Sequence, residues 1–385
     1  MTKPFENIVV VDFTHVLAGP ACSYYLGLLG AKIIKVETPH KGDAIRYRGG
    51  TDKAGAGRGM STSYLTQGAG KSSITLDLRS HEGMRRFQQL LKRADILVEN
   101  HIPTTMAALG LDQDTLLASH PHLIYCAMTG YGRGGPNENT AAYDVNIQAA
   151  CGLMDMTGTS DTGPIRTGAP IMDYATALSA GFAISAALFY REKTGKGQFV
   201  DVSMLETGLS LMSSTITDYL ATGHAPERRG NLANSRSPGA GSFACRKGVL
   251  SLGVNEESHF VALAKGLGRA DWLEDVRFAK RSDRAQHTDA LIEELQDKLS
   301  QKTAFEWEEL LQKTGVPCAA LRSLPEVLST DHIQKRGFIQ TTDDGTKVPT
   351  LPFRIGDAKV YKPSSEAPEL GAQTDEIIAW LSQEE

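Results

Sequence analysis

Asp173 is the residue of this chain best placed for covalent chemistry. It follows GAPIM and precedes a long run of small and apolar residues, so it lies where a helix begins. A carboxylate there can cap the first helical turn, with Thr176 three residues on. A helix N-terminus also favours the ionised form that a nucleophilic carboxylate needs. Both roles, helix cap and nucleophile, are open for Asp173.

A second polar pair, Tyr143 and Asp144, lies in NTAAYDVNIQAACG, where a loop turns into a helix. Asp144 suits a helix N-cap and Tyr143 a packed aromatic ring, and both are also candidates for a site. His15 follows the first apolar run, either as a hydrogen-bonded core histidine or as a ligand contact. The motifs H-E-x-x-H, G-x-S-x-G and Walker A do not occur, so metalloprotease, serine hydrolase and P-loop chemistries are not indicated.

Basic residues follow the second apolar run. The segment TPHKGDAIRYRGG (38–50) carries Arg46 and Arg48, and Lys71 precedes a later run. Guanidinium groups match phosphate oxygens, so these residues suit a phosphorylated ligand, although a solvated basic loop has the same composition. GYGRGG (130–135) fits G-x-G-x-x-G but is followed by PNEN rather than by a helix. It predicts a ligand-facing loop at the end of a strand more than a dinucleotide fingerprint.

Alternating strands and helices must position these residues. The β-branched runs that predict strands are 8–12, 33–37, 72–78, 95–100, 123–130 and 197–204. The segments that predict helices are 80–94, which begins at Ser80, 104–109, 113–118, 174–192 and a single helix over 205–221. This alternation predicts an α/β fold with a parallel, Rossmann-like sheet, whose strand ends would carry the candidate residues.

The second half of the chain predicts a smaller α+β domain. A polar stretch over 222–242 ends in SPGAGS, which contains Gly239 and Gly241 and is either a mobile lid or a linker. A hairpin over 243–253 and helices over 258–267, 283–299 and 303–314 follow. A segment over 347–356 and a last helix over 374–383 return to the first domain. The predicted division is therefore 1–220, 221–335 and 336–385.

Composition limits the classes of function. The 385 residues carry 40 Lys and Arg against 45 Asp and Glu, a net charge of −5, which argues against a dedicated nucleic-acid-binding protein. Five scattered cysteines favour free thiols over disulfides or a zinc site. The N-terminus has no signal-peptide pattern and no run of 18 uncharged apolar residues occurs, so we expect a cytoplasmic protein without a membrane segment.

Several segments, in order, resemble the family III CoA-transferases (the CaiB/BaiF family), which include formyl-CoA and carnitine CoA-transferases and 2-methylacyl-CoA racemases. VVDFTHVLAGPACSYYLGLLGAKIIKVETPHKGDAIR (10–46) is similar to the N-terminal signature of the family. Later landmarks match at 74–78, 95–103, 130–136, 194–204, 315–338 and 369–378.

The resemblance implies a nucleophilic aspartate, aligned here with Asp173, and an interlocked homodimer. The enzyme would move coenzyme A between an acyl-CoA and a carboxylic acid through aspartyl-anhydride and aspartyl-CoA thioester intermediates. No permanently bound cofactor or metal is implied, since acyl-CoA is a substrate.

The same resemblance places the CoA contacts at His15, Ala18, Lys35, Arg46, Lys71 and Asn100. Arg46, within G-D-x-x-R, is the expected phosphate contact. Ala108 and Ala141 stand where formyl-CoA transferases carry cationic residues. CoA binding is therefore expected to depend more on Arg46, Lys71 and Arg133.

Tyr143 favours one branch of this family. In the racemases a histidine precedes the aspartate of the loop that matches AAYDVN, and here Tyr143 takes that place, as in the transferases. A phenol with a pKa of about 10 suits α-proton transfer poorly, so a transferase is favoured over the alternative, a 2-methylacyl-CoA racemase. Glu256, where racemases carry a supporting acid, points the other way.

The acceptor acid is predicted from two departures in sequence. Leu17 stands where formyl-CoA transferases have a glutamine, so a small dicarboxylate acceptor with succinyl-CoA or acetyl-CoA as donor is preferred. Arg228, Arg229 and Arg236, near SPGAGS, are candidates to pair with its second carboxylate.

Overall fold

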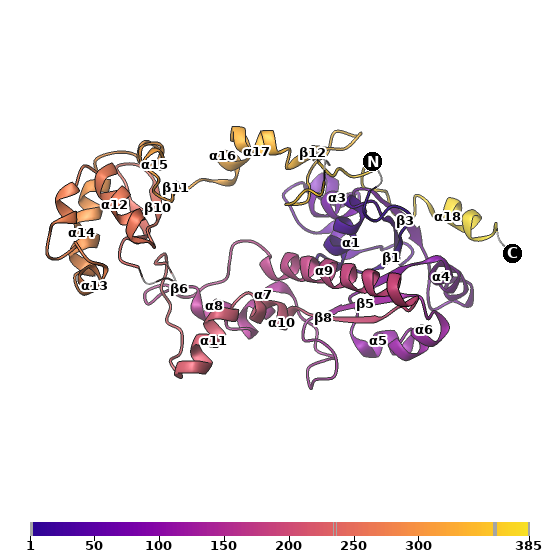
Figure 1. Ribbon diagram of the computed structural model, residues 1–385. Helices are drawn as coiled ribbons and strands as arrows, with labels where there is room; N and C mark the ends of the chain where they lie inside the picture. The colour runs from indigo at the N-terminus through magenta and orange to yellow at the C-terminus, as the bar shows by residue number, and fades with distance from the viewer. Residues whose placement is uncertain (1–2, 234, 236, 357–359, 384–385) are drawn as a thin grey trace. The chain divides into compact units, whose positions relative to one another are not determined.

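The computed structural model describes residues 3–233, 235, 237–356 and 360–383 (Figure 1). The chain divides into two compact units. The first contains Met1–Met154, Arg166–Ala225 and Gln334–Glu385, and the second contains Asp155–Ile165 and Pro226–Ile333. Residues 155–165 thus cluster with the second unit, whereas the sequence-based division includes them in 1–220.

A parallel sheet with strand order β3-β2-β1-β4-β5-β8 forms the centre of the first unit. Its strands are β1 Val9–Phe13, β2 Lys32–Glu37, β3 Lys71–Thr75, β4 Ile96–Glu99, β5 Ile124–Thr129 and β8 Phe199–Ser203. This is the doubly wound, Rossmann-like order that the alternation predicts. The winding reverses between β1 and β4, so the loops after these two strands lie side by side at the edge where such sheets bind ligands.

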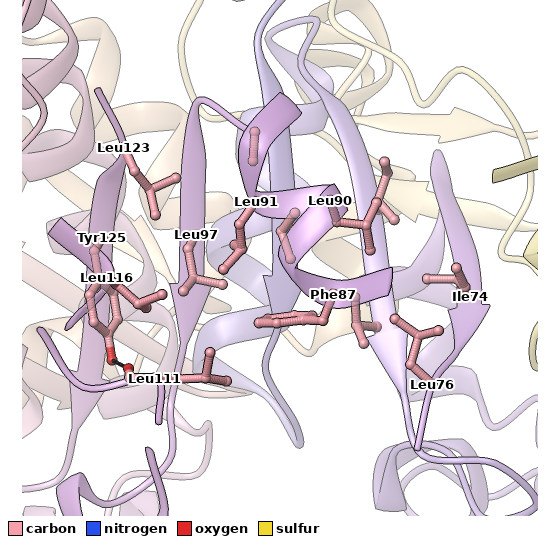
Figure 2. Packing of buried hydrophobic residues seen from close by; sticks show 14 of the residues in the cluster. Ile74, Leu76, Phe87, Leu90, Leu91, Leu97, Leu111, Leu116, Leu123 and Tyr125 are labelled. Atoms are coloured by element: carbon pink, nitrogen blue, oxygen red, sulfur yellow. Dashed lines mark hydrogen bonds between the residues drawn. The ribbon is translucent and has the colours of Figure 1, made fainter. Parts of the chain in front are cut away.

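Helices cover both faces of this sheet. Successive strand residues point to opposite faces of a sheet. Val10 and Val11 of β1 are both fully buried because both faces are covered. The face of Val11 packs against α4 His81–Arg93, α5 Pro103–Ala108, α6 Gln113–Ser119 and α18 Thr374–Leu381. Figure 2 shows Phe87, Leu90 and Leu91 of α4 pointing at the strands. The face of Val10 packs against α1 Ala18–Leu28 and α9 Ile171–Thr194.

Helix α9 runs along the sheet (Figure 1) and presents Ala177, Ala180 and Ala187 to it, small side chains that allow close packing. It begins three residues before the predicted start, which places Asp173 inside its first turn. In the part of the chain that the structure describes, α9 is the one helix that could cross a membrane by length and composition alone, and 33% of its apolar window is buried inside the protein.

The remaining elements of the first unit, or at its borders, are short. They are η1 Ala44–Tyr47, α2 Lys53–Gly57, α3 Thr62–Gly68, α7 Asp144–Ala150, α8 Leu153–Met156, α10 Met204–Ser210, α11 Ser213–Thr222, α17 Asp331–Arg336, β12 Ile339–Thr341 and β13 Lys347–Pro349. The prediction of one helix over 205–221 is wrong, because the chain breaks between α10 and α11. The Ser213 hydroxyl there donates to the carbonyl of Ser210 at 2.6 Å, a local hydrogen bond that competes with helix continuation.

The second unit is the predicted smaller α+β domain. Its antiparallel sheet has the order β11-β10-β9, from β9 Ala240–Ala244, β10 Val249–Gly253 and β11 Cys318–Ala320. The other elements are β6 Gly158–Thr159, β7 Gly163–Pro164, α12 Glu257–Gly266, η2 Ala270–Leu273, α13 Arg281–Gln286, α14 Thr288–Leu299, α15 Ala304–Lys313 and α16 Leu324–Ser329. The helix predicted over 283–299 is interrupted at His287, which separates α13 from α14. Buried Trp272, Phe278 and Leu291 form its own core.

Candidate active site

A cavity of about 310 Å³ lies at the carboxyl edge of the parallel sheet, at the reversal between β1 and β4. The loops after β1, β4 and β5 line it together with the first turn of α9. It contains these predicted site residues: His15, Leu17, Ala18, Asn100, Ala141, Tyr143 and Asp173. The cavity also contains His101, which the sequence analysis did not single out.

Asp173 is half-buried in this cavity and does not cap the helix. Pro170 occupies the N-cap position of α9, and Asp173 is the third residue of the helix. Burial, and next the neighbouring Asp144 carboxylate, raise the pKa of Asp173 to about 7, although a hydrogen bond from the backbone N–H of Ala18 opposes them. Desolvation and the like charge of Asp144 thus oppose the ionised form that a helix N-terminus favours.

Asp144 is a buried second carboxylate beside Asp173. It is the first residue of α7, and one of its oxygens accepts from the backbone N–H of Met172 at 2.7 Å. The other oxygen accepts from the side-chain amide of Gln148 at 2.6 Å. Asp144 thus caps α9 rather than its own helix. Its neighbour Tyr143 takes the N-cap position of α7 and is 60% exposed in the cavity wall, not packed.

Lys35 and Lys71 lie inside the protein, not in the cavity. Both ammonium groups are buried and share the carboxylate of Asp12, at 4.0 Å for Lys35 and 2.8 Å for Lys71. Lys35 also lies 3.0 Å from a carboxylate oxygen of Asp43. A direct contact of these lysines with CoA would require breaking buried ion pairs.

Arg46 and Arg133 also form ion pairs with buried carboxylates. Nε and Nη2 of Arg46 donate to the two carboxylate oxygens of Glu37, at 2.7 and 2.6 Å, and the side chain is buried. The guanidinium of Arg133 donates to buried Glu99 at 2.7 Å. The expected phosphate contact through Arg46 has no free guanidinium face in this arrangement, because the bidentate pair with Glu37 already uses it.

The remaining candidates lie in the second unit. Gly239 is buried and Gly241 is paired with Leu252 inside β9, so part of SPGAGS is strand rather than loop. Glu256 is exposed at the N-terminus of α12. Arg228 donates to the carbonyl and the carboxylate of Asp155, at 2.6 and 3.0 Å, and lines a hollow with Arg229. Arg236 lies outside the described residues.

A wider, open groove of about 930 Å³ runs along α4. Basic side chains line it, namely Arg79, His81, Arg85 and Lys92, and Ala108 lies at its edge. Helix α5 connects the two hollows, since Thr105 lines the Asp173 cavity and Ala108 the groove. No sequence-based prediction covers this groove.

Comparisons with known proteins agree with this geometry. The sequence profile described as CoA-transferase family III matches residues 5–374. The chain is 31% identical to the mouse (Mus musculus) succinyl-CoA:glutarate CoA-transferase over 98% of its own length and 86% of that protein. It is 32% identical to the acetyl-CoA:oxalate CoA-transferase of Acetobacter aceti, over 96% and 94%. A crystal structure of a CaiB/BaiF family protein from Brucella suis superposes with a TM-score of 0.87 at 31% identity, covering 99% of this chain and 100% of that one.

Proposed function

The chain belongs to CoA-transferase family III, and on that basis we propose that Asp173 carries coenzyme A from a donor acyl-CoA to a small carboxylate. The observation that supports this role is the position of Asp173 in the cavity at the sheet edge, with its pKa raised to about 7. A carboxyl group that titrates near neutral pH is both ionised in a large fraction of molecules and more basic, hence more nucleophilic, than an ordinary aspartate.

The proposed reaction is a sequence of balanced acyl transfers. The Asp173 carboxylate attacks the thioester carbon, the C–S bond breaks, and CoA leaves as a thiolate from an aspartyl anhydride. The thiolate then attacks the aspartyl carbonyl, releases the donor acid as a carboxylate and leaves an aspartyl-CoA thioester. The acceptor carboxylate displaces CoA from Asp173, and the thiolate finally attacks the acceptor carbonyl to form the new acyl-CoA. No net proton is consumed, so the ionised form of Asp173 both starts and ends the cycle.

We propose a small dicarboxylate as the acceptor. Glutarate and oxalate, the acceptors in the names of the relatives, are dicarboxylates. The apolar side chain of Leu17 in the cavity suits the methylene chain of an acid longer than oxalate. Arg228 and Arg229, the expected partners of a second carboxylate, line a hollow of the second unit, where Arg228 already binds Asp155.

The phosphate-bearing end of CoA is proposed to bind in the groove along α4. Lys92 is exposed there, and Arg79 lies at the other end of the lining. These cations would replace the basic residues that are missing at Ala108 and Ala141. Residues of α5 line both the groove and the Asp173 cavity, and we propose that CoA spans the two across this helix.

A homodimer in the cytoplasm is also proposed. Helix α9 exposes Leu178, Phe182 and Phe189, at 45%, 80% and 63%, an apolar row that a second copy would cover. The five cysteines are free, as expected in a reducing compartment.

Intact mass spectrometry tests the central proposal. Incubation with succinyl-CoA or acetyl-CoA should add an acyl or CoA adduct to the wild-type chain. Hydroxylamine should then displace CoA or the donor acid from the aspartyl carbonyl and leave Asp173 as a hydroxamate. Asp173→Asn should form no adduct, and the control Asp218→Asn, an exposed carboxylate on α11, should form the wild-type amount. Full turnover by Asp173→Asn would refute the proposal. Deuterium uptake at the α-carbon of a branched acyl-CoA without any acceptor would instead support the racemase.

A further inference from the structure

The loop between β1 and α1 contains a backbone conformation that its sequence disfavours. Val16 has a φ of +68°. The branch at Cβ makes this left-handed conformation an outlier for valine, whereas glycine adopts it freely. Such a conformation persists only where the surroundings impose it, and outliers of this kind concentrate at functional sites.

Asp43 and Lys35 impose the left-handed conformation of Val16 from one side. The backbone N–H of Val16 donates to a carboxylate oxygen of Asp43 at 3.0 Å. The ammonium of Lys35 donates to the carbonyl of Thr14 at 3.0 Å and lies 3.0 Å from the other oxygen of Asp43. Both side chains are about 1% exposed, so water does not compete for these bonds. One buried ion pair thus holds the loop on both sides of His15.

Asn100, in the loop after β4, holds His15, the residue between Thr14 and Val16. The backbone N–H of His15 donates to the side-chain oxygen of Asn100 at 2.9 Å. The amide group of Asn100 donates back to the carbonyl of His15 at 2.8 Å. Three consecutive residues, 14–16, are therefore fixed by side chains from three other segments.

The loop leads directly to the site. Leu17 is the N-cap of α1 and has no side-chain hydrogen bond of its own to fix the helix start. The next residue, Ala18, lines the same cavity as Asp173, and its backbone N–H favours the ionised form of the Asp173 carboxylate. The conformation of Val16 therefore determines where this donor points.

We propose that Asp43 is a positioning residue for the reaction: it holds Val16 in the left-handed conformation and thereby keeps the Ala18 N–H directed at the Asp173 carboxylate. This inference rests on the proposed nucleophilic role of Asp173. The N–H bond stabilises the ionised carboxylate, so its loss raises the pKa of Asp173 further. The other titratable groups around Asp173 are Asp144, His15, His101, Tyr143 and Tyr174.

The test is the pH dependence of Asp173 acylation in single-turnover experiments, followed by intact mass spectrometry with a donor acyl-CoA. Asp43→Ala should move the acid limb upward by about one pH unit, because the carboxylate loses one hydrogen bond. Asp43→Asn should leave the limb near its wild-type position, since the amide oxygen still accepts from Val16. The double variant Val16→Gly/Asp43→Ala should move the limb less than Asp43→Ala, because glycine needs no clamp.

Asp52→Ala is the matched control. Asp52 accepts from the backbone N–H of Gly55 at 2.9 Å, as Asp43 accepts from Ile45 at 3.0 Å, but it makes no bond to the β1–α1 loop. The acid limb of Asp52→Ala should not move. If Asp43→Ala does not fold, Asn100→Ala releases the same loop from a less buried position and must give the same upward shift.

A folded Asp43→Ala, or Asn100→Ala in its place, with an unmoved acid limb overturns the inference. So does a double variant that shifts as far as Asp43→Ala. Failure of the proposed function looks different, because the wild-type chain would then form no adduct on Asp173 at any pH.

Discussion

Replacing Asp144 by Asn should change the pH at which the enzyme becomes active. Asp144 is, after burial, the group that raises the pKa of Asp173 to about 7. An asparagine at this position keeps an oxygen that can accept from Met172, so the cap on α9 survives while the negative charge and the hydrogen bond from Gln148 are removed. The acid limb of kcat/KM should therefore move to lower pH.

The size of the shift follows from the proximity of the two carboxyl groups. The Asp144 oxygen that caps Met172 is also 3.4 Å from the backbone nitrogen of Asp173. At an effective dielectric constant of about 20, two like charges about 4 Å apart repel by about 4 kcal/mol, and by less at larger separations. Solvent at the half-buried Asp173 reduces this, so we expect a decrease of about 1 to 2 pKa units. At pH 6 the ionised fraction would rise from about 10% to roughly three quarters for a decrease of about 1.5 units.

The assay is the pH profile of kcat/KM with a saturating acceptor, measured for wild type, Asp144→Asn and the exposed control Asp218→Asn. We expect Asp144→Asn to exceed the relative activity of wild type at pH 6 several-fold, with circular dichroism showing an unchanged fold. The control should follow wild type. An acid limb of a folded Asp144→Asn that stays at the wild-type pH, or moves upward, refutes the repulsion argument and leaves burial as the whole cause.

Three further predictions concern stability, binding and assembly. The pKa of Asp173 in the folded protein is above its unfolded value of 3.8, so ionisation of Asp173 destabilises the fold progressively from about pH 4 to about pH 7. Asp173→Asn should therefore raise Tm by a few degrees at pH 8 and leave it unchanged below pH 4, which calorimetry can measure. Lys92→Ala should raise KM for acyl-CoA several-fold and for a 3′-dephospho analogue less, while Lys196→Ala, before β8, should change neither; equal effects on both donors would place the phosphate elsewhere. Phe182→Asp should weaken the proposed homodimer in light scattering, and Val276→Asp, a similarly exposed control in the second unit, should not; a Phe182→Asp chain as dimeric as wild type would remove α9 from the proposed interface.

The strands of the large sheet could be predicted because their residues are buried on both faces. IVVVD and IIKVE read as continuous β-branched runs, and the observed β1 and β2 differ from the prediction by one residue at each end or less. Helix limits were harder to place, because they depend on caps from distant segments. The start of α9 is fixed by Asp144, which lies 29 residues before Asp173 in the chain.

The prediction that basic residues contact CoA differs most from the structure, because these residues are buried in ion pairs. The family resemblance predicts Lys35 and Arg46 as CoA contacts, and Arg46 is also predicted from its place after the second strand. The missing signal was the acidic residues inside the same buried runs, Asp12 in IVVVD and Glu37 in IIKVE. A carboxylate within a fully buried strand must be paired with a cation. The nearest basic side chains then form ion pairs with it and are not free to bind a ligand.

The environment of Asp173 bears on the covalent intermediates as well as on its pKa. Burial and Asp144 both disfavour the charged carboxylate, whereas the acylated and thioesterified forms of Asp173 carry no charge there. The same two features therefore favour the covalent intermediates over the free anion, beyond what the pH dependence alone reports. Asp144→Asn removes one of them, so at pH 8, where Asp173 is ionised in both proteins, the variant should hold a smaller steady-state fraction of covalent adduct by intact mass spectrometry. An adduct fraction equal to that of wild type would show that Asp144 acts on the proton only and not on the acyl group.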